Sequence, residues 1–451
     1  MQRHNYNRIR RMKRTLYNSL LKWKESPRRK PLVLEGARQV GKTWLLQEFG
    51  RNEYENMVYI NCSEQEFAKT LFLDNLVPNR IIRDIVANTG LRITPGRTLI
   101  FFDEIQDAPN GITSLKYFCE DAPEQHVVVA GSLLGVVHHP GESYPVGKVN
   151  MLRLYPMTFE EFIWAKGNAM LGKIVKDCEW DSFTALNHNL KDLLRQYFYV
   201  GGMPEAVLEW VTTEDVLNVR EIQNRILSSY ANDISKHAGN DTERVRMVWN
   251  SIPAQLAKEN KKFVYGAVRK GGRAKDFEVA IQWLVDAGLA YKIHRCNSPE
   301  QPLKFYEDFD AFKLYLLDVG LLGALAKVSA GKILVNNDVF KEYKGALTEN
   351  YVLEQLITIE NLVIYYFSKE NSKVEVDFLV QTNKRVIPIE VKAEENVKSK
   401  SLSQFVRIDH ANKNLKGLRC SMKPYIDQEW MENIPLYSVK AYIDKENEIQ
   451  I

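Results

Sequence analysis

Short apolar runs separated by longer mixed segments follow one another through the first third of the chain. The runs lie at residues 32–34, 58–62, 98–102 and 126–130. They are rich in Val, Ile, Leu and Phe, which is typical of strands buried on both faces. Residues 44–49 and 80–88 between them have helical periodicity. This alternation predicts an α/β domain built on a parallel sheet.

The pattern turns helical from residue 154 to about residue 216. A Gly-Gly-x-Pro element within residues 199–206 interrupts it and predicts a helix stop, a tight turn and a new helix start. An all-helical segment that follows such an α/β domain is where a lid over a site on that domain would lie. We therefore expect a helical lid.

Residues 243–295 have the order of a winged helix. A helix over 245–259, a Gly271-Gly272 turn, a second helix over 275–287 and a strand over 288–294 follow one another. Four cationic side chains lie where the second helix begins: Arg269, Lys270, Arg273 and Lys275. Winged helices bind DNA in some proteins and other proteins in others. We therefore expect this segment to contact either DNA or a protein partner.

The last third combines a helix over residues 344–356 with two strands. Residues 375–380 alternate between polar and apolar positions, whereas residues 385–392 carry apolar side chains on both faces. The second pattern indicates a buried strand.

Composition narrows the class of protein. The 451 residues are 26% charged and 45% hydrophobic, as in ordinary globular proteins, and a length of about 150 residues per domain suggests about three domains. The net charge of +4 is too small to indicate a nucleic-acid partner by itself. Five scattered cysteines without a C-x-x-C pair fit a reducing compartment, and no apolar run is long enough to cross a bilayer. We expect a cytoplasmic protein.

The first thirty residues are strongly basic. Leucines at 16, 20 and 21 have helical spacing, which predicts an amphipathic helix packed on the α/β core. Its cationic side is either a solvated face or a contact with DNA phosphates.

A phosphate-binding loop follows the first apolar run. The pattern G-x-x-x-x-G-K-[ST] is formed by Gly36, Ala37, Arg38, Gln39, Val40, Gly41, Lys42 and Thr43. Backbone N–H groups and a helix N-terminus would enclose the phosphates of ATP. Lys42 would reach the β- and γ-phosphates, and the Thr43 hydroxyl would bind Mg²⁺. The alternative is a chance glycine-rich turn.

Two carboxylates end the apolar run at residues 98–102. Asp103 would hold Mg²⁺ through water, and Glu104 would activate the water that attacks the γ-phosphate. Ser132, after the next apolar run, is a candidate γ-phosphate sensor, although Gly131-Ser132 is also a plain turn signal. His138 and His139 lie in an expected loop and lack further ligands for a metal site.

A second set of chemical side chains lies near the C-terminus. Asp377, Glu390 and Lys392 form D-x12-E-x-K. A hairpin would bring Asp377 beside Glu390 and Lys392, which share one face of their strand. With Glu349 from the preceding helix, the carboxylates could hold Mg²⁺ while Lys392 assists an attacking water. The alternative is a solvated pair of charged strands.

These segments together resemble a known family. They are GARQVGKT at 36–43, FDEIQ at 102–106, GSLL at 131–134, LYPMTFEEF at 154–162, GGMP at 201–204, GALTE at 345–349, EVD at 375–377 and EVK at 390–392. They resemble bacterial and archaeal AAA-class ATPases with a C-terminal uncharacterised domain that bears restriction-endonuclease-like PD-(D/E)xK motifs. The resemblance implies ATP binding, hydrolysis and self-association. Lys148 stands where a family arginine often lies, which makes it a weak stand-in for an arginine finger.

We therefore expect a multidomain α/β protein. Its segments are a basic extension (1–30), a P-loop ATPase core (31–165), a helical lid (166–240), a winged helix (241–300) and a PD-(D/E)xK nuclease-like domain (301–451). ATP and Mg²⁺ are the expected cofactors, and DNA and a second copy of the chain are the expected partners. Two outputs remain open: a nuclease gated by nucleotide, or a regulatory switch whose nuclease-like domain binds without cutting.

Overall fold

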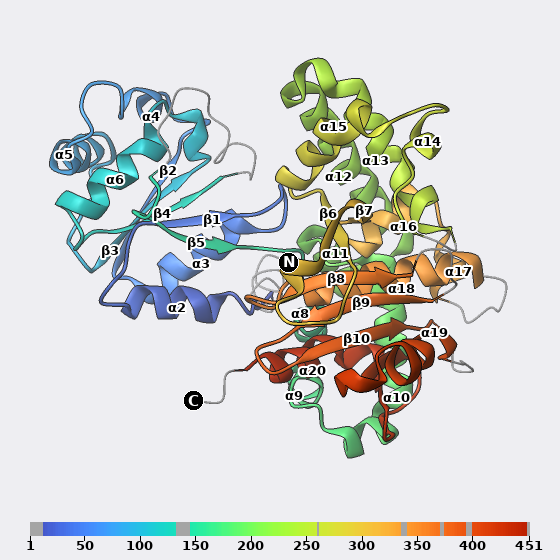
Figure 1. Ribbon diagram of the computed structural model, residues 1–451. Helices are drawn as coiled ribbons and strands as arrows, with labels where there is room; N and C mark the ends of the chain where they lie inside the picture. Colours follow the sequence, from blue (N-terminus) through green and yellow to red (C-terminus); the bar gives the residue numbers. More distant parts are fainter. Residues whose placement is uncertain are drawn as a thin grey trace. The chain divides into compact units, whose positions relative to one another are not determined.

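The computed structural model describes residues 12–131, 145–258, 261–334, 341–369, 374–393 and 399–448. The chain divides into two compact units (Figure 1). Lys13–Tyr155 forms the P-loop unit, with which Asp286–Gly288 is grouped, and the remaining chain from Pro156 onward forms the C-terminal unit.

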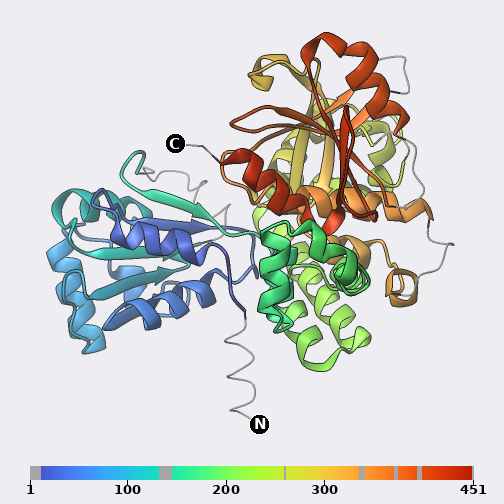
Figure 2. The ribbon, with the colours of Figure 1, turned by 90° about the horizontal axis from the view of Figure 1, so that it is seen from below.

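The P-loop unit is a five-stranded parallel sheet with helices on both faces (Figures 1 and 2). Its elements are α2 (Tyr17–Glu25), β1 (Leu32–Glu35), α3 (Lys42–Glu53), β2 (Asn56–Asn61), α4 (Glu66–Thr70), α5 (Pro78–Thr89), β3 (Thr98–Asp103), α6 (Gly111–Asp121), β4 (His126–Ala130) and β5 (Asn150–Arg153). The strand order is β2-β3-β4-β1-β5. The parallel sheet expected from the four apolar runs is confirmed. The fifth strand was not expected, because Asn150–Arg153 carries no apolar run.

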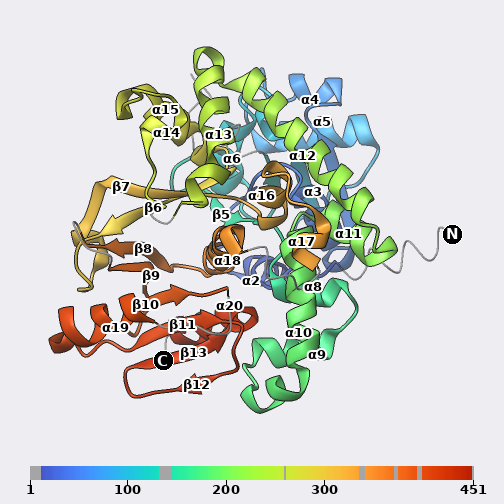
Figure 3. The same ribbon diagram turned by 90° about the vertical axis from the view of Figure 1, so that its right-hand side faces the viewer.

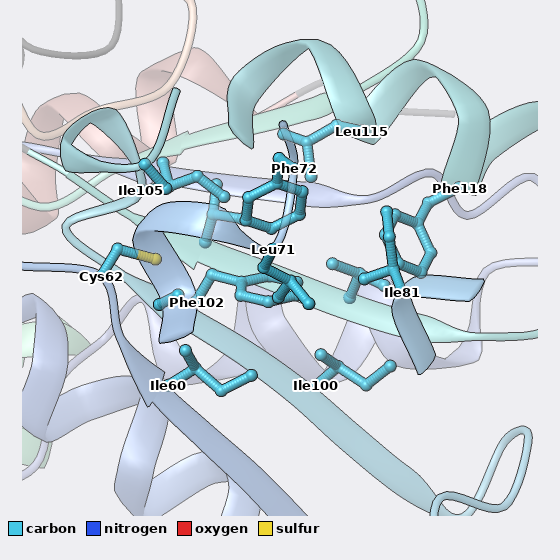
Figure 4. Packing of buried hydrophobic residues seen from close by; sticks show 14 of the residues in the cluster. Ile60, Cys62, Leu71, Phe72, Ile81, Ile100, Phe102, Ile105, Leu115 and Phe118 are labelled. Carbon is cyan, nitrogen blue, oxygen red and sulfur yellow. The ribbon is translucent and has the colours of Figure 1, made fainter. Parts of the chain in front are cut away.

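The core of this sheet explains the sequence pattern. Every second side chain along the strands faces α5 and α6. Ile60, Ile100 and Phe102 are examples, and they pack against Ile81 and Phe118 (Figure 4). On β3 the intervening side chains are buried as well, so every residue from Thr98 to Asp103 is removed from water. The helix expected in the basic N-terminal stretch is α2, whose Leu20 and Trp23 are buried against the core. Tyr17 and Phe49 of α3 meet edge to face.

The C-terminal unit begins with helices and ends with a mixed sheet. Its helices are α8 (Phe159–Ala165), α9 (Ala169–Lys176), α10 (Trp180–Val200), α11 (Pro204–Thr213), α12 (Val216–His237), α13 (Thr242–Leu256), α14 (Tyr265–Val268), α15 (Ala274–Asp286), α16 (Val319–Leu325), α17 (Ala330–Leu334), α18 (Lys341–Leu356), α19 (Lys400–Gln404) and α20 (Val439–Asn447). The helical pattern expected after residue 154 is confirmed. The stop at Gly-Gly-x-Pro is the junction between α10 and α11, where Gly201 has φ +74° and Pro204 starts the new helix.

The strands of the C-terminal unit form one sheet of eight (Figure 3). They are β6 (Ala290–Cys296), β7 (Glu307–Leu316), β8 (Val363–Ser368), β9 (Glu375–Gln381), β10 (Val386–Val391), β11 (Gly417–Ser421), β12 (Ile426–Asp427) and β13 (Met431–Pro435), in the order β12-β13-β11-β10-β9-β8-β6-β7. The hairpin β6–β7 follows α13, α14 and α15, which is the order expected of a winged helix. This hairpin spans the boundary expected at residue 300 and pairs with β8, so both sides of that boundary share a sheet.

Candidate functional site

The phosphate-binding loop lies between β1 and α3. Gly36 has φ +156°, and a Cβ atom at this position would come closer than 3.0 Å to the Leu154 carbonyl oxygen. Gly41 has φ +95°, a conformation that favours glycine, and Lys42 starts the helix. Gln39 also has a positive φ, +65°. The loop therefore curls in front of the N-terminus of α3, where free backbone N–H groups favour an anion.

Lys42 lies within this loop. Its side chain is buried, and Nζ donates hydrogen bonds to the carbonyl oxygens of Gly36 and Ala37, each at 2.9 Å. Burial lowers the pKa of Lys42 to about 8, although the carboxylates of Glu104 and Asp103 oppose the shift. Two backbone carbonyl oxygens therefore hold the ammonium group. It can exchange them for phosphate oxygens.

Thr43 and Asp103 join the loop to the end of β3. Thr43 Oγ1 donates to Asp103 Oδ2 at 2.8 Å, and the Tyr59 hydroxyl donates to the same oxygen at 3.0 Å. Burial raises the pKa of Asp103, and these two hydrogen bonds oppose the rise. A hydroxyl and a carboxylate oxygen are ligands that suit Mg²⁺. The two residues expected to hold the metal beside ATP are thus adjacent.

Glu104 directly follows β3 and has a left-handed backbone, with φ +49°. Its Oε2 accepts a hydrogen bond from Gln106 Nε2 at 2.5 Å. The side chain is partly exposed. This position beside Asp103 suits the expected role of activating water, which stays a prediction.

Arg14 is a part of the site that sequence reasoning missed. Its side chain is buried, and Nη1 donates to the Val40 carbonyl oxygen at 2.9 Å while Nη2 donates to the Tyr155 carbonyl oxygen at 2.5 Å. The guanidinium thus links the phosphate-binding loop to the end of the unit. In the sequence it is one of many cations in a basic stretch, and no pattern marks it as buried.

The remaining residues singled out in this unit are Ser132, His138, His139 and Lys148. Ser132, His138 and His139 lie outside the described residues. Lys148 forms an ion pair with Glu120 at 2.8 Å within the P-loop unit. The candidate for an arginine finger is therefore engaged with its own unit.

The second set of side chains lies where α18, β9 and β10 meet. The Val391 N–H donates to Asp377 Oδ2 at 2.8 Å, and Lys392 Nζ lies 3.0 Å from Glu390 Oε1. Glu349 is hydrogen-bonded to Asp377. The hairpin expected to bring Asp377 beside the following strand is confirmed by the antiparallel pairing of β9 with β10.

Two lysines that the sequence did not single out occupy this same place. Lys261 Nζ pairs with Glu349 Oε1, and Lys313 Nζ lies 3.9 Å from Glu349 Oε2 and 2.5 Å from Glu375 Oε1. No group of three His, Cys, Asp or Glu side chains in the described ranges could hold a metal ion. The structure therefore departs from the three-carboxylate Mg²⁺ set expected from Glu349, Asp377 and Glu390, because lysines lie against Glu349.

The pKa values in this cluster follow from burial and these neighbours. Burial and the Glu349 carboxylate raise the pKa of Asp377 to about 7. Burial also acts to raise the pKa of Glu349, but the ammonium groups of Lys261 and Lys313 lower it overall. Near neutral pH, Glu349 therefore carries its charge while Asp377 can hold a proton.

The segment with winged-helix order presents its cations to solvent. Arg269, Lys270, Arg273 and Lys275 are exposed at the start of α15, and the Arg269 guanidinium lies 5.9 Å from the centre of the Phe277 ring. The positions expected to contact a partner are thus accessible. Contact with DNA stays a prediction.

Comparisons with known proteins bear on each unit. Residues 28–163 match a family model described as an AAA domain, and residues 191–332 and 344–440 match two models described as domains of unknown function (DUF8612 and DUF4143). A search of curated proteins found no match. Among the helices in the described part of the chain, none combines the length and apolar character needed to span a membrane.

Several solved structures are similar at low identity. The Orc1 protein of Aeropyrum pernix in complex with DNA is 14% identical, with 72% of this chain and 92% of that chain covered and a TM-score of 0.30. The RuvB Holliday junction branch migration motor of Thermotoga maritima is 14% identical, with 66% and 90% covered and a TM-score of 0.29. Cdc6p of Pyrobaculum aerophilum is 11% identical, with 72% and 93% covered and a TM-score of 0.24. With the parallel sheet and the loop at residues 36–43, the family match identifies residues 28–163 as an AAA-class P-loop domain.

Proposed function

We propose that the P-loop unit binds ATP with Mg²⁺ and hydrolyses it. The observation that carries this proposal is the joint placement of Lys42 at the start of α3 and of Thr43 against Asp103. A cation, a helix N-terminus and two oxygen ligands surround one small region, which is the set that a triphosphate with its metal requires.

The residues have distinct roles in this proposal. Lys42 would exchange the carbonyls of Gly36 and Ala37 for phosphate oxygens. Thr43 and Asp103 would hold Mg²⁺, which when bound neutralises charge on the β- and γ-phosphates. Glu104, next to Asp103, would accept a proton from the attacking water. Ser132 keeps its candidate role as a sensor of the γ-phosphate.

The consequence of hydrolysis would be a conformational change that alters the C-terminal unit. Self-association belongs to the same proposal, as does contact with DNA through the exposed cations at the start of α15. For the C-terminal unit, the lysines against Glu349 favour the reading as a regulatory switch over the reading as a nuclease.

ATP turnover by the purified full chain tests the proposal. Wild type should release phosphate in the presence of Mg²⁺, Lys42→Ala should lose both binding and turnover, and Glu104→Gln should bind ATP but turn it over at least about a hundredfold more slowly. Absence of ATP binding by the wild type would end the proposal. Plasmid DNA incubated with Mg²⁺ and ATP, with Lys392→Ala alongside, separates the two outputs: cleavage by wild type and not by the variant would support the nuclease.

A further inference from the structure

A cluster of opposite charges lies between β7, β9, β10 and α18 of the C-terminal unit, and three of its members, Lys313, Glu349 and Glu390, are buried. Its members are the carboxyl groups of Glu349, Glu375, Asp377 and Glu390 and the ammonium groups of Lys261, Lys313 and Lys392. We call it the acid–lysine cluster. Four carboxyl groups face three ammonium groups, and a proton on Asp377 would balance the charge.

The carboxylates of Glu349 and Asp377, which the sequence pattern predicts as Mg²⁺ ligands, are already engaged. Glu349 faces Lys261 with Oε1 and Lys313 with Oε2. Asp377 Oδ2 accepts a hydrogen bond from the Val391 N–H at 2.8 Å. Mg²⁺ requires near-octahedral oxygen ligands at about 2.0–2.1 Å, and a lysine ammonium repels it at such a position. The residues present do not fit the metal in this arrangement.

Lys313 is built into the core and is not a surface side chain that happens to lie nearby. It is 0% exposed, and its Nζ lies 4.8 Å from the centre of the Tyr366 ring. Burial of an ammonium group is costly unless carboxylates compensate it. Glu375 at 2.5 Å and Glu349 at 3.9 Å provide that compensation.

Lys261 reaches the cluster from the segment between α13 and α14. That segment is tied to β7, since the Phe263 N–H donates to the Phe312 carbonyl oxygen at 2.8 Å and the two rings stack at 5.2 Å. The Lys261 side chain is 13% exposed, so it lies nearer to solvent than Lys313. It covers Glu349 from the outer side of the cluster.

We infer that Lys261 and Lys313 supply the positive charge that a divalent cation supplies to such a carboxylate set, so that the C-terminal unit takes no Mg²⁺ at Glu349 and Asp377. The inference concerns the C-terminal unit and does not depend on ATP hydrolysis. It adds to the proposed function a reason why this unit would bind a partner without cutting: the metal-assisted attack of water that phosphodiester cleavage uses has no metal here.

The test measures Mn²⁺ binding to the nucleotide-free full chain by electron paramagnetic resonance. Wild type and Asp377→Asn should bind Mn²⁺ equally, because wild type has no Mn²⁺ site that depends on Asp377. Lys261→Ala, which frees Glu349 Oε1, should gain a site at least about tenfold tighter than any in wild type, and Lys261→Ala with Asp377→Asn should lose it. Lys384→Ala, at the turn between β9 and β10, is the matched control and should behave as wild type.

Each outcome of this test either supports or overturns the inference. Mn²⁺ binding by wild type that depends on Asp377 would overturn the inference, because the lysines would then not exclude the metal. Failure of both Lys261→Ala and the size-conserving Lys261→Gln to gain a site would overturn it as well. If neither variant folds, as judged by thermal unfolding, the wild-type measurement still decides. Loss of ATP turnover in Lys42→Ala leaves this test unchanged, so the two proposals fail separately.

Discussion

Thr43 Oγ1 donates a hydrogen bond to Asp103 Oδ2 at 2.8 Å, although 60 residues separate the two in the chain. The parallel sheet produces this contact, because β1 and β3 both end at the same edge, with β4 between them. The contact places a hydroxyl at the start of α3 beside a carboxylate at the end of β3. A metal that bridges the loop and β3 would find its two ligands in place.

Asp103→Asn tests this pairing, because it keeps the size of the side chain and removes its charge. We expect Mg-ATP affinity to fall by roughly 10- to 100-fold, as when a group that orients metal ligands is lost. ATP affinity in EDTA should stay within about twofold, since Lys42 and the loop N–H groups remain. Calorimetric titration with and without Mg²⁺ measures both. Asp107→Asn, an exposed neighbour, is the control, and an equal loss in both conditions would contradict the metal role.

Arg14→Met removes the link between the phosphate-binding loop and Tyr155. The Arg14 guanidinium donates to Val40 and Tyr155 carbonyl oxygens. We expect ATP affinity to fall about tenfold, since one hydrogen bond from a charged group contributes roughly 1.5 kcal/mol. Because Arg14 would only position the loop, KM for ATP should rise while kcat changes little.

The control for this variant is Arg51→Met on the outer surface of α3, where Arg51 contacts Glu48. It should leave KM unchanged. Arg14→Lys retains the charge but not the two-pronged geometry and should fall between wild type and Arg14→Met. A lower melting temperature with unaltered KM would assign Arg14 a structural role only.

Physical reasons decide which parts could be predicted from the sequence. The loop at residues 36–43 and strand β3 could be predicted because each depends on residues that are close together in the sequence. The glycine spacing predicts the loop, and the apolar run predicts a buried strand. The helix N-terminus at Lys42 and the carboxylate at Asp103 followed from them. β5 was missed because its residues alternate poorly and only their parallel pairing with β1 makes them a strand.

The acid–lysine cluster marks the limit of such prediction. Asp377 and Glu390 were found because a hairpin relates them over a short stretch of chain. Lys313 and Lys261 come from elements far away in the sequence, and their role depends on long-range pairing of β7 within the eight-stranded sheet. A lysine within the apolar stretch 311–317 is unusual, since lysine is almost never fully buried unless it is paired, and this was the one available signal.

Gly201→Ala tests the junction between α10 and α11. Gly201 has φ +74° and ψ −166°, a region that is open to glycine alone, and a Cβ atom there would come closer than 3.0 Å to Asp318 Oδ1. Asp318 cannot move away freely, because its carboxylate accepts hydrogen bonds from the Gly202 and Leu321 N–H groups at 2.6 and 2.8 Å. We expect a loss of about 2–4 kcal/mol in the free energy of unfolding.

Gly266→Ala in α14 is the matched control. Gly266 is exposed, and no atom lies within 4 Å of a Cβ atom placed there. This variant should be neutral or slightly stabilising, because alanine favours a helix over glycine. Thermal and urea unfolding of the three proteins measure the difference. Equal stability of Gly201→Ala and wild type would show that the junction tolerates a side chain.

Glu160→Gln tests a buried carboxyl group in α8. Glu160 is 8% exposed, and within the described part of the chain its Oε1 has no hydrogen-bond partner. Burial raises its pKa from 4.5 to about 7, against the opposing charges of Lys440 and Lys176. Because the folded-state pKa is raised, the folded state binds the proton more tightly than the unfolded state. The resulting stabilisation is complete below pH 4.5 and is lost as the pH rises through about 7.

Glutamine keeps the shape of Glu160 without a titrating group, so the variant should lack this part of the pH dependence. Between pH 4.5 and pH 8, wild type should lose up to about 3 kcal/mol of unfolding free energy relative to Glu160→Gln. Melting temperatures of both proteins at pH 4.5 and pH 8 measure this. Glu243→Gln, which replaces an exposed carboxylate on α13, should follow wild type at both pH values. Parallel pH profiles for wild type and Glu160→Gln would mean that solvent reaches the Glu160 carboxylate and that its burial costs nothing.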